Sequence, residues 1–198
     1  MVSEDREFVL ASSDNSADKS AGKTGRQWAT QQFVRAETLR AAGDAAAAEP
    51  LYRQIVKKHP GHVAAMRGCA DALEALGRKK RAAKMREKAD ASQSADHCAV
   101  AEKMYLAGDY AKALKCYRLA IALTPDLGEA VWGAADCLAS LGRNKSAIKW
   151  YRRYLEIEPD EPEALHMLAS LGVGAPPDRA SDDYVTAYFD RFAADFDD

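Results

Sequence analysis

Carboxylates recur at one position along this chain, and they are the first residues whose spacing suggests chemistry. Glu37, Asp71, Glu102 and Asp136 lie at the same place in segments that recur about every 34 residues. If such segments stack, equivalent side chains form a row along one face, which here is a row of carboxylates. Such a row would attract a basic or amphipathic peptide. The alternative is that these carboxylates only solvate an open face of the protein.

Further candidates for the same face are expected on the first helices. They are Phe33, Arg67, Tyr105, Trp132 and His166. Tyr105 and Trp132 are expected to act as anchors, because large aromatic side chains dominate many binding energies. The predicted partner-binding surface consists of Glu37, Arg67, Asp71, Glu102, Tyr105, Trp132, Asp136 and His166.

The four histidines and four cysteines match no catalytic or metal-binding pattern. A zinc site built from His97 and Cys98 with Cys69 or His62 would lack the usual ligand spacing, and no C-x-x-C pair occurs. A free cysteine inside a helix acts as a small hydrophobic residue, so reduced structural thiols are the better interpretation. No serine or cysteine lies at motif spacing from a histidine. The sequence therefore predicts no metal, no cofactor and no enzyme activity in this chain.

The N-terminal segment contains Ala-Gly-Lys-Thr-Gly, which suggests a phosphate-binding loop. That motif needs a glycine five residues before Gly22, where Ala17 stands, and a preceding strand, which the sequence does not predict. Residues 1–25 are polar and poor in large apolar side chains, so they cannot bury enough surface to offset the entropy lost on ordering. We expect a disordered leader over residues 1–25.

The composition is that of a globular protein with nearly balanced charges. Of the 198 residues, 47% are hydrophobic, and the formal net charge is −2. A general nucleic-acid binder would need a basic footprint, so nucleic acid is not the expected partner. No apolar run is long enough to cross a bilayer, and the acidic N-terminus lacks the positive flank of a signal peptide. These features favour a cytoplasmic location.

Apolar residues recur three and four positions apart within each repeated segment, which predicts two amphipathic helices per segment. A glycine separates the two helices each time, at Gly43, Gly77, Gly108 and Gly142. Alanines occupy the facing positions and would let the helix axes approach closely: Ala36, Ala70, Ala101, Ala135 and Ala169 in the first helices, Ala48, Ala82, Ala113 and Ala147 in the second. Pro60, Pro125 and Pro159 are expected to end the second helices.

These features resemble the tetratricopeptide repeat (TPR), a unit of two antiparallel helices that stacks into a solenoid. The resemblance implies an all-α fold with a solenoid over residues 26–174. The expected repeats are 29–62, 63–93, 94–127 and 128–161, with a partial fifth over 162–174. The first helices would line the concave face, where partners usually bind. Some relatives clamp a peptide's C-terminal carboxylate with lysine and asparagine, but the asparagine-type position is acidic here, so that function is not carried over.

The second repeat departs from the others. It is shorter, lacks a final proline, and has Arg86 where the other repeats have Tyr52, Tyr117 or Tyr151. We therefore expect an irregularity in the superhelix at this point. Its second helix is also basic, with Arg78, Lys79, Lys80, Arg81, Lys84, Arg86 and Lys88. These residues either contact an acidic partner, RNA or the leader, or they form a solvated outer face.

The C-terminal residues 175–198 are predicted to form a proline linker and one more helix. This helix has an aromatic stripe of Tyr184, Tyr188, Phe189, Phe192 and Phe196, which must be buried on the solenoid end or against a further domain. Residues 179–197 also resemble the segment that joins tetratricopeptide repeats to the catalytic domain in a group of bacterial predicted S-adenosylmethionine-dependent methyltransferases. The resemblance implies a catalytic domain that is not part of this chain. This chain would then be the repeat part of a truncated or split protein.

Two functions of different classes follow from these observations. The first is a protein-interaction module that binds a peptide or protein in the concave groove. The alternative is the N-terminal repeat part of a methyltransferase whose catalytic domain is not in this chain. A self-associating scaffold is a third hypothesis, since the open ends of solenoids stack readily.

Overall fold

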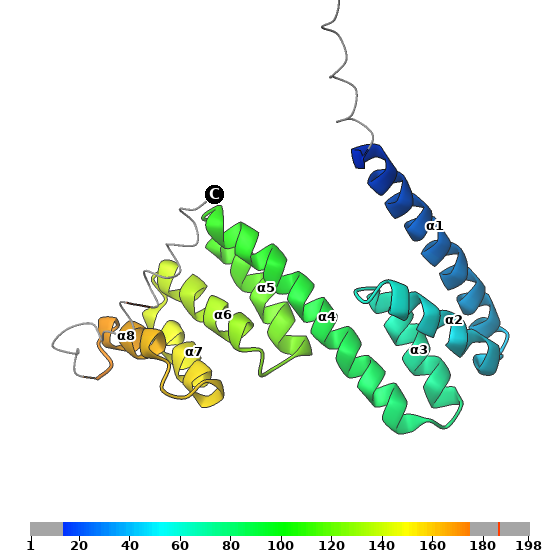
Figure 1. The fold of residues 1–198 in the computed structure, drawn as a ribbon. Coiled ribbons are helices and arrows are strands. Elements are labelled where there is room, and N and C mark those ends of the chain that lie inside the picture. The colour runs from blue at the N-terminus through cyan, green and yellow to red at the C-terminus, as the bar shows by residue number, and fades with distance from the viewer. Residues whose placement is uncertain (1–13, 175–185, 187–198) are drawn as a thin grey trace, which may run out of the picture. The chain divides into compact units, whose positions relative to one another are not determined.

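The computed structural model describes residues 14–174 and residue 186, with side chains from residue 25 onwards. All regular elements in this part of the chain are α-helices (Figure 1). They are α1 (Asp14–Ala41), α2 (Ala45–Lys58), α3 (Val63–Ala75), α4 (Lys79–Leu106), α5 (Tyr110–Leu123), α6 (Gly128–Ser140), α7 (Asn144–Ile157) and α8 (Pro162–Ser170). The predicted aromatic residues Tyr184, Tyr188, Phe189, Phe192 and Phe196 lie outside the described residues, so their role stays a prediction.

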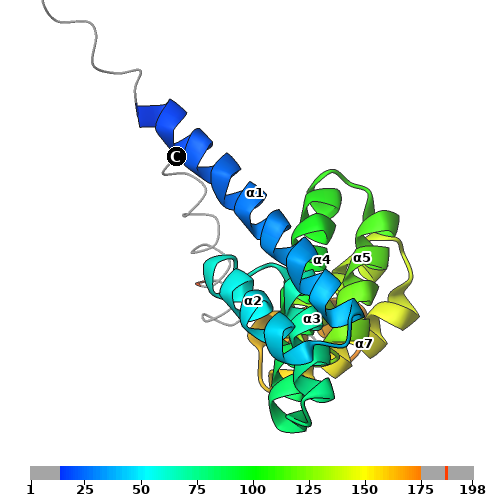
Figure 2. The same cartoon turned by 90° about the vertical axis from the view of Figure 1, so that its right-hand side faces the viewer.

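Successive helices pack against each other within two compact units, residues 1–89 and residues 90–198. In the first unit α1 packs on α2 and α2 on α3 (Figure 2). In the second unit α5 packs on α6, α6 on α7 and α7 on α8. None of the described helices has the length and apolar character that a membrane crossing requires.

A glycine in the left-handed conformation ends each first helix, as the sequence predicts. At Gly43 the backbone φ is +83°, and the N–H of the next residue, Asp44, reaches back to the Leu39 carbonyl at 2.9 Å. The Gly43 N–H itself donates to the Arg40 carbonyl at 3.0 Å, which completes a Schellman motif. The same pair of bonds recurs at Gly142, where φ is +68°. A residue with a side chain would be strained there.

The second helices end just before a proline, which also agrees with the prediction. Helix α2 ends at Lys58, α5 at Leu123 and α7 at Ile157, two residues before Pro60, Pro125 and Pro159 respectively. A proline cannot donate the next helical hydrogen bond, and it disfavours a helical conformation in the residue before it.

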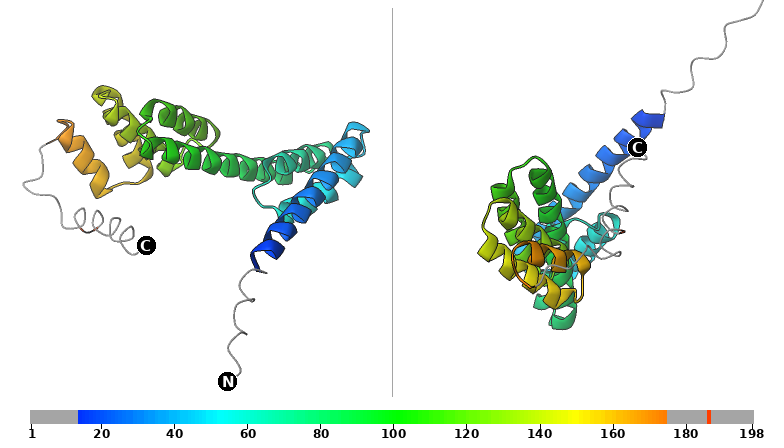
Figure 3. Two further views of the ribbon diagram at one scale, coloured as in Figure 1. Left: turned by 90° about the horizontal axis from the view of Figure 1, so that it is seen from above. Right: turned by 90° about the vertical axis from the view of Figure 1, so that its left-hand side faces the viewer.

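Helix α4 runs through the predicted repeat boundary between residues 93 and 94. The structure has one unbroken helix of 28 residues, Lys79–Leu106, where the repeat pattern predicts two helices joined by a turn (Figure 3). The physical reason is local: this stretch contains neither glycine nor proline and is rich in alanine, lysine and glutamate. Ala82 and Ala89 at its beginning pack in the core of the first unit, and Cys98 and Ala101 in that of the second.

Helix α1 also differs from the sequence prediction. It begins at Asp14, so residues 14–25 are helical although we expected them to belong to a disordered leader. The segment has no proline, and its alanines and lysines are good helix formers. Its two glycines each cost only about 1 kcal/mol of helix stability.

Small residues allow close contact between helices at two kinds of position. Eight of the predicted facing alanines are fully buried, whereas Ala169 is half-buried. A tyrosine of each of two second helices also packs on a glycine of the following first helix. A Cβ atom added to Gly68 would lie 2.5 Å from the Tyr52 ring, and one added to Gly133 would lie 2.3 Å from the Tyr117 ring. Glycine is therefore required by packing at these two places.

Candidate functional site

Three of the four predicted carboxylates have a partner within their own repeat, fifteen residues further along the chain. Glu37 accepts a short hydrogen bond from the Tyr52 hydroxyl. Asp136 accepts one from the Tyr151 hydroxyl at 2.5 Å. In each case the acid comes from a first helix and its partner from a second helix of the same repeat. The tyrosines are fully buried, so these bonds satisfy hydroxyl groups that have lost contact with water.

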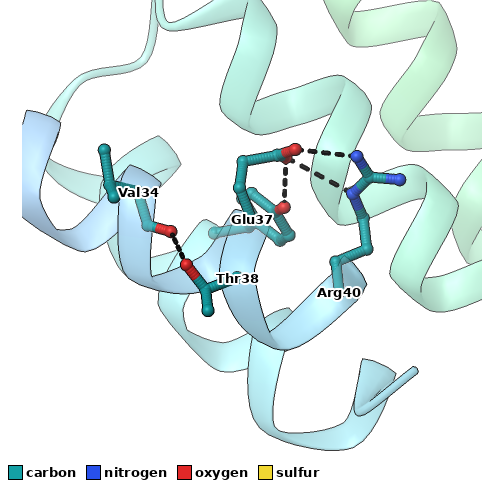
Figure 4. A network of polar contacts seen from close by, with 5 residues as sticks. Val34, Glu37, Thr38 and Arg40 are labelled. Atoms are coloured by element: carbon teal, nitrogen blue, oxygen red, sulfur yellow. Dashed lines mark hydrogen bonds and ion pairs between the residues drawn. The ribbon is translucent and has the colours of Figure 1, made fainter. Parts of the chain in front are cut away.

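Glu37 is also paired with a cation on its own helix. The Arg40 Nη2 atom lies 2.7 Å from Glu37 Oε2 (Figure 4). The hydrogen bond from Arg40, and then that from Tyr52, lower the pKa of Glu37. Burial raises the pKa of Tyr52 to about 12, and the hydrogen bond with Glu37 acts in the same direction. The negative charge of Glu37 is therefore compensated within α1.

Asp71 is paired with an arginine, whereas Glu37 and Asp136 are hydrogen-bonded to a tyrosine. Arg86 Nη2 lies 3.2 Å from Asp71 Oδ1 and also pairs with Glu74. Arg86 stands at the position that is aromatic in the other repeats. Like the tyrosines at that position, it reaches the acid of the first helix of its own repeat. Arg86 is exposed, so solvent screens both ion pairs and each contributes little to stability. Its effect here is to neutralise the acidic position of the second repeat.

The second unit brings three of the predicted residues into one cluster. Trp132 packs edge-on against Tyr151, with ring centroids 5.3 Å apart, and against Tyr154 at 5.1 Å. Burial raises the pKa of Tyr105, and the nearby carboxylate of Asp136 raises it further. We call Tyr105, Trp132 and Asp136, with Tyr151 and Tyr154 beneath them, the aromatic–acid cluster. Tyr105, Trp132 and Asp136 are half-buried, so a part of each side chain remains accessible.

The other predicted residues lie on α4 and α8 of the second unit or in the first unit. Glu102 is exposed on α4, one turn before Tyr105, and His166 is half-buried on α8. Arg67 is exposed on α3, one turn before Asp71. In the first unit Phe33 lies beside Tyr52, with ring centroids 6.0 Å apart, and beside His62 at 5.3 Å. A binding role of any of these residues stays a prediction.

The tyrosine and arginine partners of the acids are what sequence reasoning missed. The signal was present, because an acid and a hydrogen-bonding side chain fifteen residues later recur in every repeat, including Glu102 with Tyr117. The charge of Glu102 is one of the lesser causes that raise the pKa of Tyr117, after burial. Pairing across two helices cannot be inferred from helical periodicity alone, which only relates residues on one helix.

No group of three or more His, Cys, Asp or Glu side chains is placed to hold a metal ion among the described residues. Burial raises the pKa of Cys69 and of Cys98 to about 11 each and that of Cys137 to about 12. These thiols are thus protonated near neutral pH, and the protonated thiol is a poor nucleophile. All four cysteines are free.

Comparison with known families identifies the family of this chain. The sequence model of the tetratricopeptide repeat matches residues 39–97 and 104–171. Since these two stretches make up more than half of the chain, the protein belongs to the tetratricopeptide repeat family. The break between the two matched stretches lies inside the unbroken helix α4.

Several solved structures are similar to this chain at low sequence identity. MamA is 19% identical, with 69% of this chain and 81% of MamA covered and a TM-score of 0.40. YrrB, described as a TPR protein with an unusual peptide-binding site, is 18% identical, with coverage of 77% and 80% and a TM-score of 0.41. The first TPR domain of human RPAP3 is 19% identical, with coverage of 73% and 90% and a TM-score of 0.32. No curated protein sequence gives a significant match.

Proposed function

We propose that this protein is a protein-interaction module and that the aromatic–acid cluster of the second unit is its binding surface. The expected partner is a basic or amphipathic peptide segment of another protein. The observation that carries the proposal is the juxtaposition of half-buried Tyr105, Trp132 and Asp136 on two first helices, α4 and α6. In tetratricopeptide repeats the first helices line the concave face.

Trp132 has the properties of an anchor residue. Two tyrosine rings hold its indole in place, so little side-chain freedom remains to be lost on binding. A partly exposed, preoriented aromatic ring beside a carboxylate suits an aliphatic side chain followed by a lysine or arginine. His166 lies on the next first helix, α8, and is a further candidate contact.

Charge favours the second unit over the first. Glu37 and Asp71 are paired with Arg40 and Arg86, which offsets their attraction for a basic ligand. The second unit offers an exposed carboxylate, that of Glu102 on α4, in addition to the half-buried Asp136. We therefore narrow the predicted surface to Glu102, Tyr105, Trp132, Asp136 and His166, with Glu37, Arg67 and Asp71 in a minor role.

The test begins with peptides selected from a random library on the immobilised protein. The double variant Glu102→Gln with Asp136→Asn removes two charges while an amide oxygen can still accept the Tyr151 hydrogen bond. At low salt we expect the affinity for selected peptides to fall about tenfold, which corresponds to about 1.4 kcal/mol. Isothermal titration calorimetry measures the change.

A matched control changes two exposed acids elsewhere in the same unit, Asp126→Asn with Glu156→Gln. This control should leave the affinity within about twofold, because surface charges outside the site act only at long range. Equal losses in both double variants would contradict the proposed site. Selected peptides without any excess of lysine or arginine would contradict the proposed partner.

A second candidate rests on residues 179–197, which resemble the junction with a methyltransferase domain. These residues lie outside those described, apart from residue 186, so the resemblance stays a prediction. Co-expression with a methyltransferase domain, followed by co-purification with the wild type but not with Tyr188→Ala and Phe192→Ala, would support it. Self-association is the third hypothesis, and a molar mass that does not change with concentration in light scattering would exclude it.

A further inference from the structure

Exposed cations of two helices meet around one buried carboxylate in the first unit. Glu49 on α2 is only 5% exposed, although glutamate side chains are rarely buried. Arg53 Nη2 on the same helix lies 3.8 Å from Glu49 Oε2. Arg81 Nη2 on α4 lies 3.6 Å from Glu49 Oε1. The buried acid therefore draws guanidinium groups from both helices to one place.

Both distances are those of ion pairs that are too long to be hydrogen bonds. Accordingly, Glu49 Oε1 has no hydrogen-bond partner within the described part of the chain. The N–H donors of Arg53 and Arg81 are thus not used by Glu49, and the two side chains are 60% and 52% exposed. Two held guanidinium groups with available donors form a ready site for carboxylate or phosphate oxygens.

Three lysines extend this site along the same flanks of the two helices. Lys57 follows Arg53 by one turn on α2, and Lys84 and Lys88 follow Arg81 by one and two turns on α4. All three are exposed. We call these residues the basic patch: Arg53, Lys57, Arg81, Lys84 and Lys88. Arg86, in contrast, points to Asp71 and Glu74 on α3, so it does not belong to the patch.

We infer that the basic patch is a second interaction site, which binds an acidic segment of a protein partner. It lies on second helices of the repeats, in the first unit, and so shares no residue with the aromatic–acid cluster. A basic patch could also attract nucleic acid, but the net charge of −2 repels a long polyanion outside the patch. A short acidic stretch would contact only the patch. The guanidinium forks would hold its carboxylates, and the lysines would add attraction.

The experiment uses the full chain and a fluorescein-labelled peptide of alternating glutamate and serine, with fluorescence anisotropy as the readout. The double variant Lys84→Glu with Lys88→Glu reverses two charges of the patch. Lys145→Glu with Lys149→Glu is a matched control, since both lysines are exposed, lie one turn apart on a second helix, and give the same change of net charge. We expect the patch variant to bind at least about tenfold more weakly, and the control to bind within about twofold of the wild type.

Two results would overturn the inference. One is an equal loss in both double variants, which would mean that only net charge matters. The other is that an oligouridine RNA of the same charge binds more tightly than the peptide and is weakened by the patch variant alone, which would make the partner a nucleic acid.

A third variant changes the affinity in the opposite direction. Glu49→Gln removes the one negative charge beneath the patch while the size of the side chain is kept. With circular dichroism unchanged, we expect the peptide to bind about threefold or more tightly, because the potential at the patch becomes more positive. An unchanged or lower affinity would contradict the electrostatic account. Should this buried substitution unfold the chain, the lysine pair alone decides the question.

Discussion

Single residues in this protein carry more than one task, and the first-helix acids illustrate it. Glu37 and Asp136 satisfy buried tyrosine hydroxyls that connect the two helices of a repeat. The same carboxylates lie on first helices, where we propose that a partner binds. Whether an acid is available for binding depends on its other neighbours, and Arg40 lies beside Glu37. The chemical character of the surface is thus set by pairs of residues rather than by the acidic position alone.

The first residue-scale prediction concerns the glycine under Tyr117. Gly133→Ala places a methyl group where a Cβ would lie 2.3 Å from the ring. Alanine should gain about 1 kcal/mol of helix propensity, but overpacking should exceed this gain and leave a net loss of about 1–3 kcal/mol in the free energy of unfolding. Urea unfolding measures the change. Gly61→Ala is the control, because nothing lies within 4 Å of its Cβ position, and a stability gain in Gly133→Ala would refute the packing argument.

The second residue-scale prediction concerns alkaline pH. Burial, followed by the charge of Asp136, raises the pKa of Tyr151, and burial raises that of Tyr52 to about 12. The folded state therefore binds more protons than the unfolded state once the pH exceeds the ordinary tyrosine pKa of about 10. The stability that protonated tyrosines provide is complete below that pH and is lost as the pH rises.

Urea unfolding between about pH 9 and pH 11 measures this loss. In Tyr151→Phe one of the titrating groups is gone, so its stability should fall less steeply than that of the wild type. Lysine deprotonation affects both proteins equally and cancels in the comparison. Parallel slopes would mean that Tyr151 is not protected from ionisation.

At the scale of secondary-structure elements, α4 is the unusual one. A 28-residue helix takes part in the cores of both units, whereas the second helix of one repeat and the first helix of the next are normally separate. Ser94 connects its second half to α5: the hydroxyl is fully buried, lies 2.8 Å from the Asp90 carbonyl oxygen and 2.8 Å from Thr124 Oγ1. A buried hydroxyl with several partners favours one position of α5 on α4.

The element-scale prediction tests whether α4 is continuous. Ala91 is exposed in the middle of the helix, so Ala91→Pro should act only through the backbone. In an unbroken helix proline costs about 3 kcal/mol or more, and circular dichroism should show a loss of helicity. Ala91→Ser, the control, should change stability by less than about 1 kcal/mol. If proline were tolerated, the two repeats would be separated by a turn after all.

At the scale of the whole molecule, charge is divided between sites while the total stays close to neutral. The net charge is −2, yet the basic patch gathers five exposed cations in the first unit, and the aromatic–acid cluster of the second unit is acidic. The two proposals therefore expect ligands of opposite charge on different units. Raising the salt concentration should weaken both interactions, and charge reversal in one unit should leave binding to the other nearly unchanged. Titration of each double variant with both peptides checks this independence.

The sequence by itself determined the helices, the turns and the family. These features depend on local physics: glycine tolerates positive φ, proline ends a helix, and alanine permits close approach. The continuity of α4 is also determined locally, since the sequence of this stretch contains neither glycine nor proline. The repeat pattern was given more weight than this local signal, so the expected repeats 63–93 and 94–127 did not reveal that one helix runs through both.

Only the tertiary structure decided which charges compensate each other. Asp71 meets Arg86, and Glu49 meets Arg81, across helices that the chain connects through intervening turns. Such pairs depend on how two helices are rotated about their axes when they pack, which periodicity does not specify. For the same reason the acids that looked equivalent in sequence have different neighbours in the folded protein: Glu37 lies beside Arg40 and Tyr52, Asp71 is paired with Arg86, and Asp136 accepts a hydrogen bond from Tyr151.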